Sequence, residues 1–529
     1  MPYYSDLRDY INVLEAAGKL RRIKRPVNKD TELHPFVRCQ FLGLKEEERT
    51  AFLFENVVDA KGRRYKMPVL IASHAPSRQV YAMGMMCSPE EIPDKWAHAI
   101  GHPLAPRVVS TSPLFEEIHS GQGLLEHGGL AEFPVPISTP GLDNAPYLTC
   151  ANFVSKDPET GVANVGNYRA MVKGPDRLGI NPGPTQHFRE HWEMCRAKGI
   201  QMQAAVFIGA TPNLGYVATA KVPYGIEEFA VAGAIAGQAI ELVKCKTVDL
   251  QVPATAEIVI EGVVPTDFME REGPFGEYTG YMGHETFNPY LEITSICHRR
   301  EPIYNAFLSQ FPPSESSKLR QIGDEAVFYK FLKHDCNIPG IIDVAIHESS
   351  GSAEYIVMRM KKTHPSQAWQ ALYAAAALIP NVGKIFIVVD EDIEPRDPGS
   401  VNWALSFRMQ PHRDLKVIEG KVSGLDPSSA PPGDPDRKYP QPHGVSALLI
   451  DATRNWDYPP VSLPRKEYMV AAKKMWEEEG LPELNFTTPW HGYFLGQWTG
   501  ENEEEAALAV QGEYFKTGEK LVQGRKKVR

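Results

Sequence analysis

Two glutamates, Glu272 and Glu277, flank a Gly-Pro-Phe-Gly segment. A regular helix cannot pass through this segment, because two glycines and a proline interrupt it. A tight turn can instead aim both carboxylates into one cavity, where two close negative charges disfavour each other and the pKa of one rises. A carboxylic acid with a raised pKa can donate a proton. From the spacing alone, however, the favoured interpretation is a surface turn with two solvated glutamates.

A second group of polar residues lies in Asn164-Val-Gly-Asn-Tyr-Arg169 and is followed by Gln186 and His187. Amide oxygen, imidazole and carboxylate ligands suit Mn²⁺ or Mg²⁺. Arg169 can hold a carboxylate or pair with Glu272. Taken singly, the histidine is typical of a hydrogen-bonded structural residue and the arginine of a surface ion pair.

A third candidate ligand is Glu228, which lies among apolar neighbours in a helical pattern. A partly buried carboxylate there needs a cation or hydrogen bonds. The alternative is the exposed face of an amphipathic helix, which suits Glu227 equally well.

The composition sets broad limits on the function. The chain has 529 residues, 43% of them hydrophobic, with 56 Lys+Arg against 66 Asp+Glu and a net charge of −10. These values predict a globular protein of about two to four domains. The acidic balance argues against a general nucleic-acid binder. Motifs typical of P-loops, metalloproteases, serine hydrolases and dinucleotide-binding domains are absent from the sequence.

The seven cysteines are widely spaced and form no Cys-x-x-Cys pair, which favours buried thiols in a reducing cytosol over disulfides or a zinc site. Neither a secretory signal nor an apolar run of membrane-spanning length is visible. We therefore expect a cytoplasmic protein that does not enter a membrane.

The elements that must position the polar residues follow from hydrophobic periodicity and turn signals. A first helix is expected from Ser5, as its N-cap, to Gly18, and residues 120–325 are expected to form an antiparallel sheet or barrel with inserted helices. A second α/β unit starts near residue 326, residues 426–442 form a loop, and the tail from Glu501 is acidic and then basic. The expected strands are Ala51–Glu55, Pro68–Ala72, Tyr147–Val154, Arg169–Lys173, Met202–Gly209, Ala256–Gly262, Ile341–His347 and Lys384–Val389, and the further expected helices are Glu227–Leu242, Ala326–Lys333, Ser366–Leu378 and Lys466–Glu479.

Several motifs occur in a fixed order along about residues 5–456. They are Asp6-Leu-Arg-Asp-Tyr, Asn164 to Arg169, Pro184-Thr-Gln-His187, Val252 to Gly262, Glu272 to Tyr281, Asp390-Glu-Asp and Ile450 to Trp456. In this order they resemble the UbiD-type decarboxylases, which use prenylated FMN. The resemblance implies an α/β and α+β multidomain fold: an N-terminal α/β domain (1–118), a central split β-barrel flavin-binding domain (119–325), a C-terminal α/β oligomerisation domain (326–500) and a charged tail (501–529).

The resemblance also implies roles for residues. It implies that Asn164, His187 and Glu228 bind Mn²⁺ (or Mg²⁺), which bridges to the cofactor phosphate with K⁺ nearby. It implies a catalytic network of Arg169, Glu272 and Glu277, in which Glu277 donates a proton to the carbon that loses CO₂. The implied cofactor-binding set is Asn164, Gly166, Asn167, Tyr168, Arg169, Gln186, His187 and Glu228.

The implied reaction is the reversible, non-oxidative decarboxylation of an aromatic or α,β-unsaturated carboxylic acid, with an aroyl-CoA thioester among the candidates. The alternatives are an aryl carboxylase working in the opposite direction and a non-catalytic subunit of a larger complex. The implied partners are a flavin prenyltransferase that supplies the cofactor and further copies of the chain in a dimer or hexamer. Two positions bear on the substrate: Ala447, where many relatives carry lysine, and Tyr439, in the loop near the expected cofactor mouth.

Overall fold

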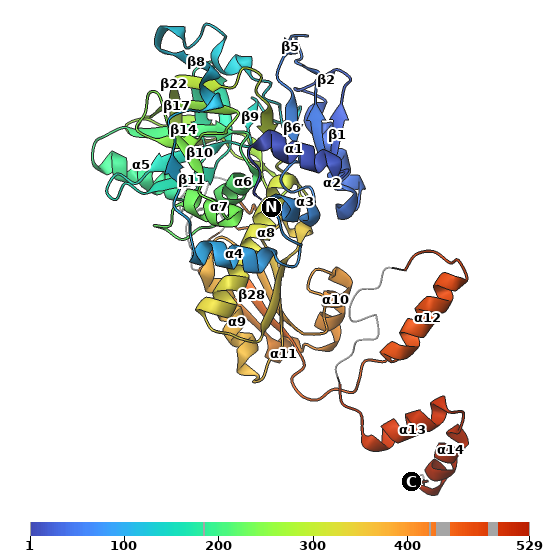
Figure 1. Cartoon of the computed structure of the whole chain (residues 1–529). Helices are drawn as coiled ribbons and strands as arrows, with labels where there is room; N and C mark the ends of the chain where they lie inside the picture. Colours follow the sequence, from blue (N-terminus) through green and yellow to red (C-terminus); the bar gives the residue numbers. More distant parts are fainter. Residues whose placement is uncertain (1, 184–185, 423–424, 430–444, 485–495, 528–529) are drawn as a thin grey trace.

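The computed structural model describes residues 2–183, 186–422, 425–429, 445–484 and 496–527. Tyr439 and most of the loop expected at 426–442 lie outside the described residues. The three largest sheets and their helices build most of the body of the molecule, and the helices after residue 465 stand apart from it (Figure 1). Among the described residues, none of the helices combines the length and the apolar character needed to cross a membrane.

The N-terminal sheet has four strands in the order β1 (Leu20–Ile23), β3 (Ala51–Phe54), β6 (Val69–Ile71) and β23 (Tyr304–Ala306). The strand β23 comes from far along the chain and pairs with β6 in parallel, Asn305 opposite Leu70. The helices of this part of the chain are α1 (Leu7–Ala16), α2 (Leu33–Gly43), α3 (Arg78–Met85) and α4 (Ile92–Gly101).

The first helix begins one residue later than its sequence predicts. The N-cap of α1 is Asp6, whose side chain accepts hydrogen bonds from the backbone N–H groups of Arg8 and Asp9. Ser5 is therefore not the cap, although its backbone N–H donates to the carboxylate of Asp9. The positive φ of Gly18, +70°, lies just beyond the helix and suits the left-handed turn that ends it.

The central sheet is antiparallel and curls. Its order is β11 (Ala163–Asn167), β10 (Asn152–Lys156), β14 (Met202–Ile208), β17 (Ile258–Val264), β22 (Tyr290–His298), β13 (Arg177–Ile180), β12 (Ala170–Gly174) and β9 (Tyr147–Leu148), with β8 (Glu117–Ser120) added on β22. Only Tyr168 and Arg169 separate β11, at one end of this order, from β12 near the other. The sheet must therefore curl until its two ends meet, which is the split barrel expected from the sequence.

One expected strand, Tyr147–Val154, is divided between the two ends of this sheet. Residues 147–148 form β9 beside β12, and β10 begins at Asn152 beside β11. The chain crosses from one end of the sheet to the other between them, so a single straight strand cannot form there. The helices α5 (His187–Ala197), α6 (Pro212–Thr219) and α7 (Glu228–Ala236) cover the strands next to this seam.

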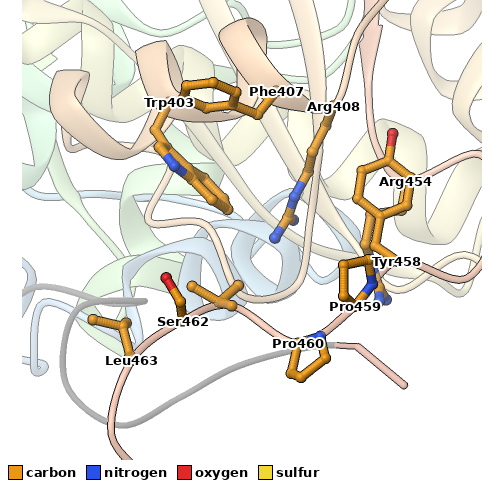
Figure 2. A pocket seen from close by; sticks show the side chains of 10 residues that line it. Trp403, Phe407, Arg408, Arg454, Tyr458, Pro459, Pro460, Ser462 and Leu463 are labelled. Atoms are coloured by element: carbon orange, nitrogen blue, oxygen red, sulfur yellow. The ribbon is translucent and has the colours of Figure 1, made fainter. Parts of the chain in front are cut away.

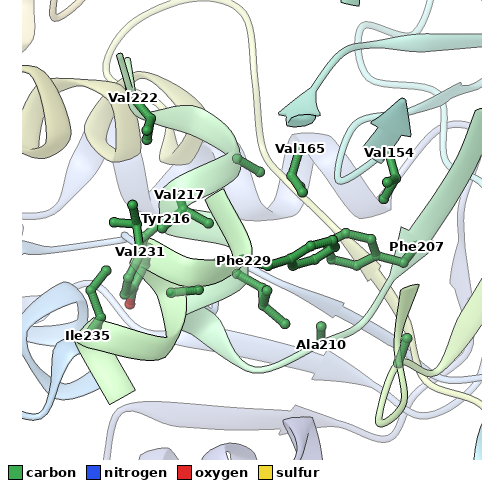
Figure 3. Close-up of a cluster of buried hydrophobic side chains, with 14 of the residues drawn as sticks. Val154, Val165, Phe207, Ala210, Tyr216, Val217, Val222, Phe229, Val231 and Ile235 are labelled. Atoms are coloured by element: carbon green, nitrogen blue, oxygen red, sulfur yellow. The ribbon is translucent and has the colours of Figure 1, made fainter. Parts of the chain in front are cut away.

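Alternation along the strands buries both faces of the central sheet. Val206 and Ile260 belong to a core cluster on one face, and Phe207 and Val259 to a cluster shared with α6 and α7 on the other. Figure 3 shows this second cluster, where Phe207 of β14 faces Phe229 of α7, their ring centroids 6.3 Å apart. The packing fixes α7 against β11.

The C-terminal sheet has the order β24 (Ile341–Ile346), β25 (Tyr355–Met360), β26 (Ile385–Asp390), β28 (Ser446–Ala452) and β27 (Leu415–Glu419). Its three inner strands are parallel. It is accompanied by α8 (Glu315–Lys330), α9 (Ser366–Leu378), α10 (Pro398–Phe407) and α11 (Pro411–Asp414). The helix expected from Ala326 begins earlier, at Glu315, so the predicted domain boundary at 325/326 falls inside α8.

Beyond the sheets lie α12 (Lys466–Glu478), α13 (Gly500–Val510) and α14 (Tyr514–Gln523), none of which has a buried residue among those described. The described part of the charged tail is thus largely helical. Lys520 of α14 pairs with Glu505 of α13 at 2.9 Å, which ties the two helices together. The seven cysteines are free thiols, but only Cys150, Cys195 and Cys297 are buried.

Candidate active site

Arg169 lies at the seam of the central sheet and holds two carboxylates. Its Nε and Nη2 atoms donate to Glu272 Oε1 and Oε2 at 2.9 Å and 2.8 Å, and Nη1 donates to Glu277 Oε1. The side chain of Glu272 is fully buried, and those of Arg169 and Glu277 are nearly so. A bidentate arginine fixes the direction of both partners, because its planar fork matches the carboxylate geometry.

The segment between the two glutamates forms the turn expected from its glycines and proline. Glu272 ends β18 (Glu270–Glu272), which pairs with β21 (Thr286–Asn288), and Glu277 follows β19 (Phe275–Gly276), which pairs with β20 (Met282–Gly283). Gly273 has a φ of +103°, a conformation that favours glycine. Because the turn is packed against the seam, the interpretation as a surface turn with solvated glutamates is wrong.

Burial makes Glu277 a candidate acid. It raises the pKa of Glu277, and the neighbouring Glu272 raises it further, while the positive charge of Arg169 lowers it. The rise prevails over the pairing with Arg169. A glutamate held in this way can carry a proton nearer to neutral pH than a solvated glutamate does.

Two further residues contact the network and were not identified as site residues from the sequence. Asn288 Nδ2 donates to Glu272 Oε2 at 3.2 Å, and the Phe275 ring lies under the Arg169 guanidinium, 5.1 Å from ring centroid to Cζ. Both contacts depend on the pairing of β18 with β21 and on the turn. No local sequence signal marks Asn288, which lies 16 residues beyond Glu272.

The three predicted metal ligands also converge. His187 Nδ1 lies 3.2 Å from Asn164 Oδ1 and 4.0 Å from Glu228 Oε1. Asn164 is on β11, while His187 and Glu228 are the first residues of α5 and α7. Both helices therefore direct their N-terminal ends, which favour anions such as phosphate, toward one strand.

The chemistry of these donors fits a divalent cation next to a phosphate. Burial raises the pKa of Glu228 to about 8, and it lowers that of His187. Asn164 Nδ2 is buried and has no hydrogen-bond partner among the described residues. A cation would favour the ionised glutamate, and a phosphate oxygen could accept from the amide. Glu227, by contrast, is the N-cap of α7 and is only partly buried, so the two neighbouring glutamates are not equivalent.

Of the remaining predicted cofactor residues, Gln186 and Asn167 make polar contacts, whereas Tyr168 and Gly166 take part in side-chain packing. Gln186 precedes α5 at the N-cap position, and its Oε1 accepts from the Gly183 N–H, outside the helix, at 2.5 Å. The Asn167 side chain lies 3.3 Å from Asn152 Oδ1. The Tyr168 ring is buried beside Phe188, with centroids 5.2 Å apart. A side chain at Gly166 would collide with the Tyr168 phenol. The structure thus places Gly166 and the Tyr168 side chain in the packing of the seam rather than toward the paired carboxylates.

The two clusters lie at opposite ends of one strand. Asn164 is near the start of β11 and Arg169 follows its end. At about 3.3 Å per residue, they are separated by at most about 17 Å. This arrangement suits a long ligand with a phosphate at one end and a reactive ring at the other.

A pocket in the C-terminal part of the chain and the position of Ala447 both lie outside the two clusters. Figure 2 shows a pocket lined by Trp403, Arg408 and Tyr458, among others, and by none of the predicted site residues. Arg408 is already bound to Asp392, its Nη2 donating to Oδ2 at 2.7 Å. Ala447, where many relatives carry lysine, is buried in the core of this sheet.

Comparison with protein families decides the identity. The models of the N-terminal, Rift-related and C-terminal domains of 3-octaprenyl-4-hydroxybenzoate carboxy-lyase, which define UbiD, match residues 11–100, 95–311 and 319–452. An uncharacterized protein of Archaeoglobus fulgidus is 32% identical over 475 residues, covering 86% of this chain and 92% of that protein. The chain belongs to the UbiD family.

Solved structures of UbiD enzymes have the same fold. An evolved dimeric form of the UbiD-class enzyme HmfF from Pelotomaculum thermopropionicum, in complex with prFMN, has a TM-score of 0.75 and 30% identity, covering 87% of this chain and 97% of that one. The vanillic acid decarboxylase of Sedimentibacter hydroxybenzoicus has a TM-score of 0.73 and 26% identity, covering 91% and 100%. The UbiD family consists of carboxy-lyases, and this chain is an enzyme of that class rather than a non-catalytic subunit.

Proposed function

We propose that this UbiD-family protein is a prenylated-FMN-dependent enzyme that removes CO₂ from an aromatic or α,β-unsaturated carboxylic acid. The observation that carries the proposal is the pairing of one arginine with two carboxylates, Glu272 and Glu277, at the seam of the split barrel. The complex of HmfF with prFMN and the vanillic acid decarboxylase support the choice of cofactor and of substrate class.

The chain's own residues supply the proton and the orientation. Loss of CO₂ from an sp² carbon leaves electrons that need an acceptor, and prenylated FMN supplies that electron sink when bound. In this proposal the raised pKa of Glu277 keeps its carboxyl group able to protonate the carbon that has lost CO₂. Arg169 orients Glu277 and can attract the substrate carboxylate, while Glu272 fixes Arg169.

The metal cluster would hold the other end of the cofactor. Asn164, His187 and Glu228 would bind Mn²⁺ or Mg²⁺ next to the cofactor phosphate, with K⁺ as a further counterion. The N-terminal ends of α5 and α7 would add favourable electrostatic potential for that phosphate. Neither cluster needs a basic surface, so the net charge of −10 is compatible with an anionic substrate.

The proposal also includes the direction of the reaction and the kind of carboxylic acid that serves as substrate. Decarboxylation is the proposed physiological direction, and carboxylation at high CO₂ is the reverse of the same steps. A free aryl acid is the simplest substrate, with an aroyl-CoA thioester as the larger candidate. We further propose a homo-oligomer in the cytoplasm, a dimer or hexamer assembled through the C-terminal domain, and a flavin prenyltransferase as the cofactor supplier.

The deciding experiment is co-expression with a flavin prenyltransferase, followed by CO₂ release assays on aryl acids, unsaturated acids and their CoA esters. We expect a bound flavin and release of CO₂ from at least one acid. Labelled bicarbonate exchanging into the same acid would show that the reaction is reversible. Protein that binds no flavin under these conditions would contradict the proposal.

A further inference from the structure

A second group of metal-binding side chains lies away from the seam, where β8 adds to the central sheet. His119 is on β8, His298 is the last residue of β22, and Glu132 ends the 3-10 helix Gly129–Glu132. Because His119 pairs with Ile296, His298 lies two residues further along the partner strand and on the same face. Figure 1 shows β8 and β22 at the end of the molecule opposite the C-terminal sheet.

These three side chains converge on one point. One ligand atom of each, a ring nitrogen or a carboxylate oxygen, lies within 4.8 Å of the other two. His298 Nε2 and Glu132 Oε1 are 3.7 Å apart. Ligands at about 2.0–2.1 Å in a tetrahedral zinc site are about 3.3 Å from one another, so small rotations would close this group around an ion.

Both histidines have a buried ring nitrogen that lacks a hydrogen bond within the described part of the chain. His119 is 8% exposed and His298 is 3% exposed. The Nε2 atoms of both are buried without a hydrogen-bond partner among the described residues. A buried polar atom left unpaired is costly, and a histidine that ligates a metal through that nitrogen removes the cost.

The other nitrogen of His298 fixes the direction of its lone pair. Nδ1 lies 2.7 Å from the Arg299 carbonyl oxygen, which can only accept, so Nδ1 carries the proton. Nε2 then faces the Glu132 carboxylate, 3.7 Å away, and a positive charge between the two atoms, either a proton on Nε2 or a metal ion, satisfies both. A backbone carbonyl behind the ring is the usual support of a metal-binding histidine.

We propose that His119, Glu132 and His298 bind a divalent transition metal of the zinc type, with a water as the fourth ligand. Two imidazoles and one carboxylate are a zinc-type donor set, unlike the amide-containing set at Asn164. The ion would join the edge strand β8 and the nearby Gly129–Glu132 turn to the end of β22, which comes much later in the chain. Its role would be to clamp this edge of the sheet, independently of the decarboxylation proposed above.

The test uses the full-length protein, stripped with a chelator and reloaded with Zn²⁺, with bound metal measured by elemental analysis. We expect one tightly bound Zn²⁺ per chain and a rise in thermal midpoint of about 3 °C or more. His119→Ala and His298→Gln should lose both. Co²⁺ in place of Zn²⁺ should give visible absorption bands that the same variants lack.

Two controls separate this site from others. His187→Ala removes a ligand of the seam cluster and should keep the Zn²⁺. His102→Ala removes one of two stacked histidines, His98 in α4 and His102 directly after its end, and should behave like the unmodified protein. If a histidine variant does not fold, Glu132→Gln decides, because this side chain is 21% exposed and tolerates change more easily. Zn²⁺ that binds equally to the unmodified protein and to Glu132→Gln, or that does not bind, would overturn the proposal and leave an ordinary His298–Glu132 ion pair.

Discussion

The Arg169 guanidinium binds the Glu272 carboxylate through two parallel hydrogen bonds of 2.9 Å and 2.8 Å, although the two residues are 103 positions apart in the chain. The third nitrogen is thereby directed at Glu277. The position of the proposed proton donor thus depends on a residue that need not touch the substrate. Each contact of this network can be tested separately.

Arg169→Lys should keep the positive charge at this position but lose the bidentate pairing with Glu272. A lysine presents one ammonium group and cannot hold Glu272 at two points while it orients Glu277. We expect kcat/KM for CO₂ release to fall on the order of 100-fold, as small misplacements of reacting groups do. Arg177→Lys is the matched control, because Arg177 lies on a neighbouring strand and pairs with Glu270 at 2.8 Å. Equal losses in both variants would contradict a specific role for Arg169.

Glu277→Gln should retain the bound flavin but lose most of the CO₂ release. The amide has nearly the same shape but cannot donate an acidic proton, so CO₂ release should fall about 10²- to 10⁴-fold. Flavin absorbance of the purified variant and turnover of the best substrate are the two measurements. The control is Glu285→Gln, whose carboxylate pairs with the exposed Arg271. Full activity in Glu277→Gln would exclude it as the proton donor.

Glu272→Gln should shift the pH dependence. The charge of Glu272 raises the pKa of Glu277, so its removal lowers that pKa. Decarboxylation in this scheme needs protonated Glu277, and the protonated fraction falls as pH rises through its pKa. The alkaline limb of the kcat profile should therefore move to lower pH in the variant. A limb that stays in place, or that moves equally in Glu270→Gln, would argue against this coupling.

Glu228→Gln should separate metal binding from stability. In metal-free protein, replacing a buried ionisable carboxyl with an amide should raise the free energy of unfolding by about 1–3 kcal/mol. The Val165 N–H, which donates to Glu228 Oε2 at 2.9 Å, keeps an acceptor in the glutamine. Mn²⁺ content should fall, as it should in His187→Ala. Glu227→Gln is the neighbouring control and should keep its Mn²⁺, and full Mn²⁺ in Glu228→Gln would contradict the ligand assignment.

The sequence was sufficient to predict helices and strands that have a strong hydrophobic periodicity. The helix Ser366–Leu378 matches α9, and Ala51–Glu55 contains β3. Local patterns could not predict that Tyr147–Val154 divides across the seam, because the curl of the sheet arises from pairing with distant strands. The start of α8 at Glu315 was missed because its first turns carry buried polar residues, such as Lys318, that lack an apolar pattern.

For the site as well, motifs predicted which residues come together, whereas tertiary contacts determined how deeply they are buried. The motifs predicted the residues that converge on Arg169 and on Asn164. The spacing of Glu272 and Glu277 alone, however, favoured two solvated glutamates. Burial decided otherwise, and burial depends on the whole fold. Asn288 and the cluster of His119, Glu132 and His298 escaped the sequence analysis for this reason.

The return of the chain to its first sheet has a consequence during synthesis. β23 completes the edge of β6, and the Glu315 carboxylate accepts hydrogen bonds from the Ala72 and His74 backbone N–H groups at 2.9 Å and 2.8 Å. A nascent chain therefore has an open β6 edge until the segment through Glu315 has left the ribosome, and such edges pair readily with other chains.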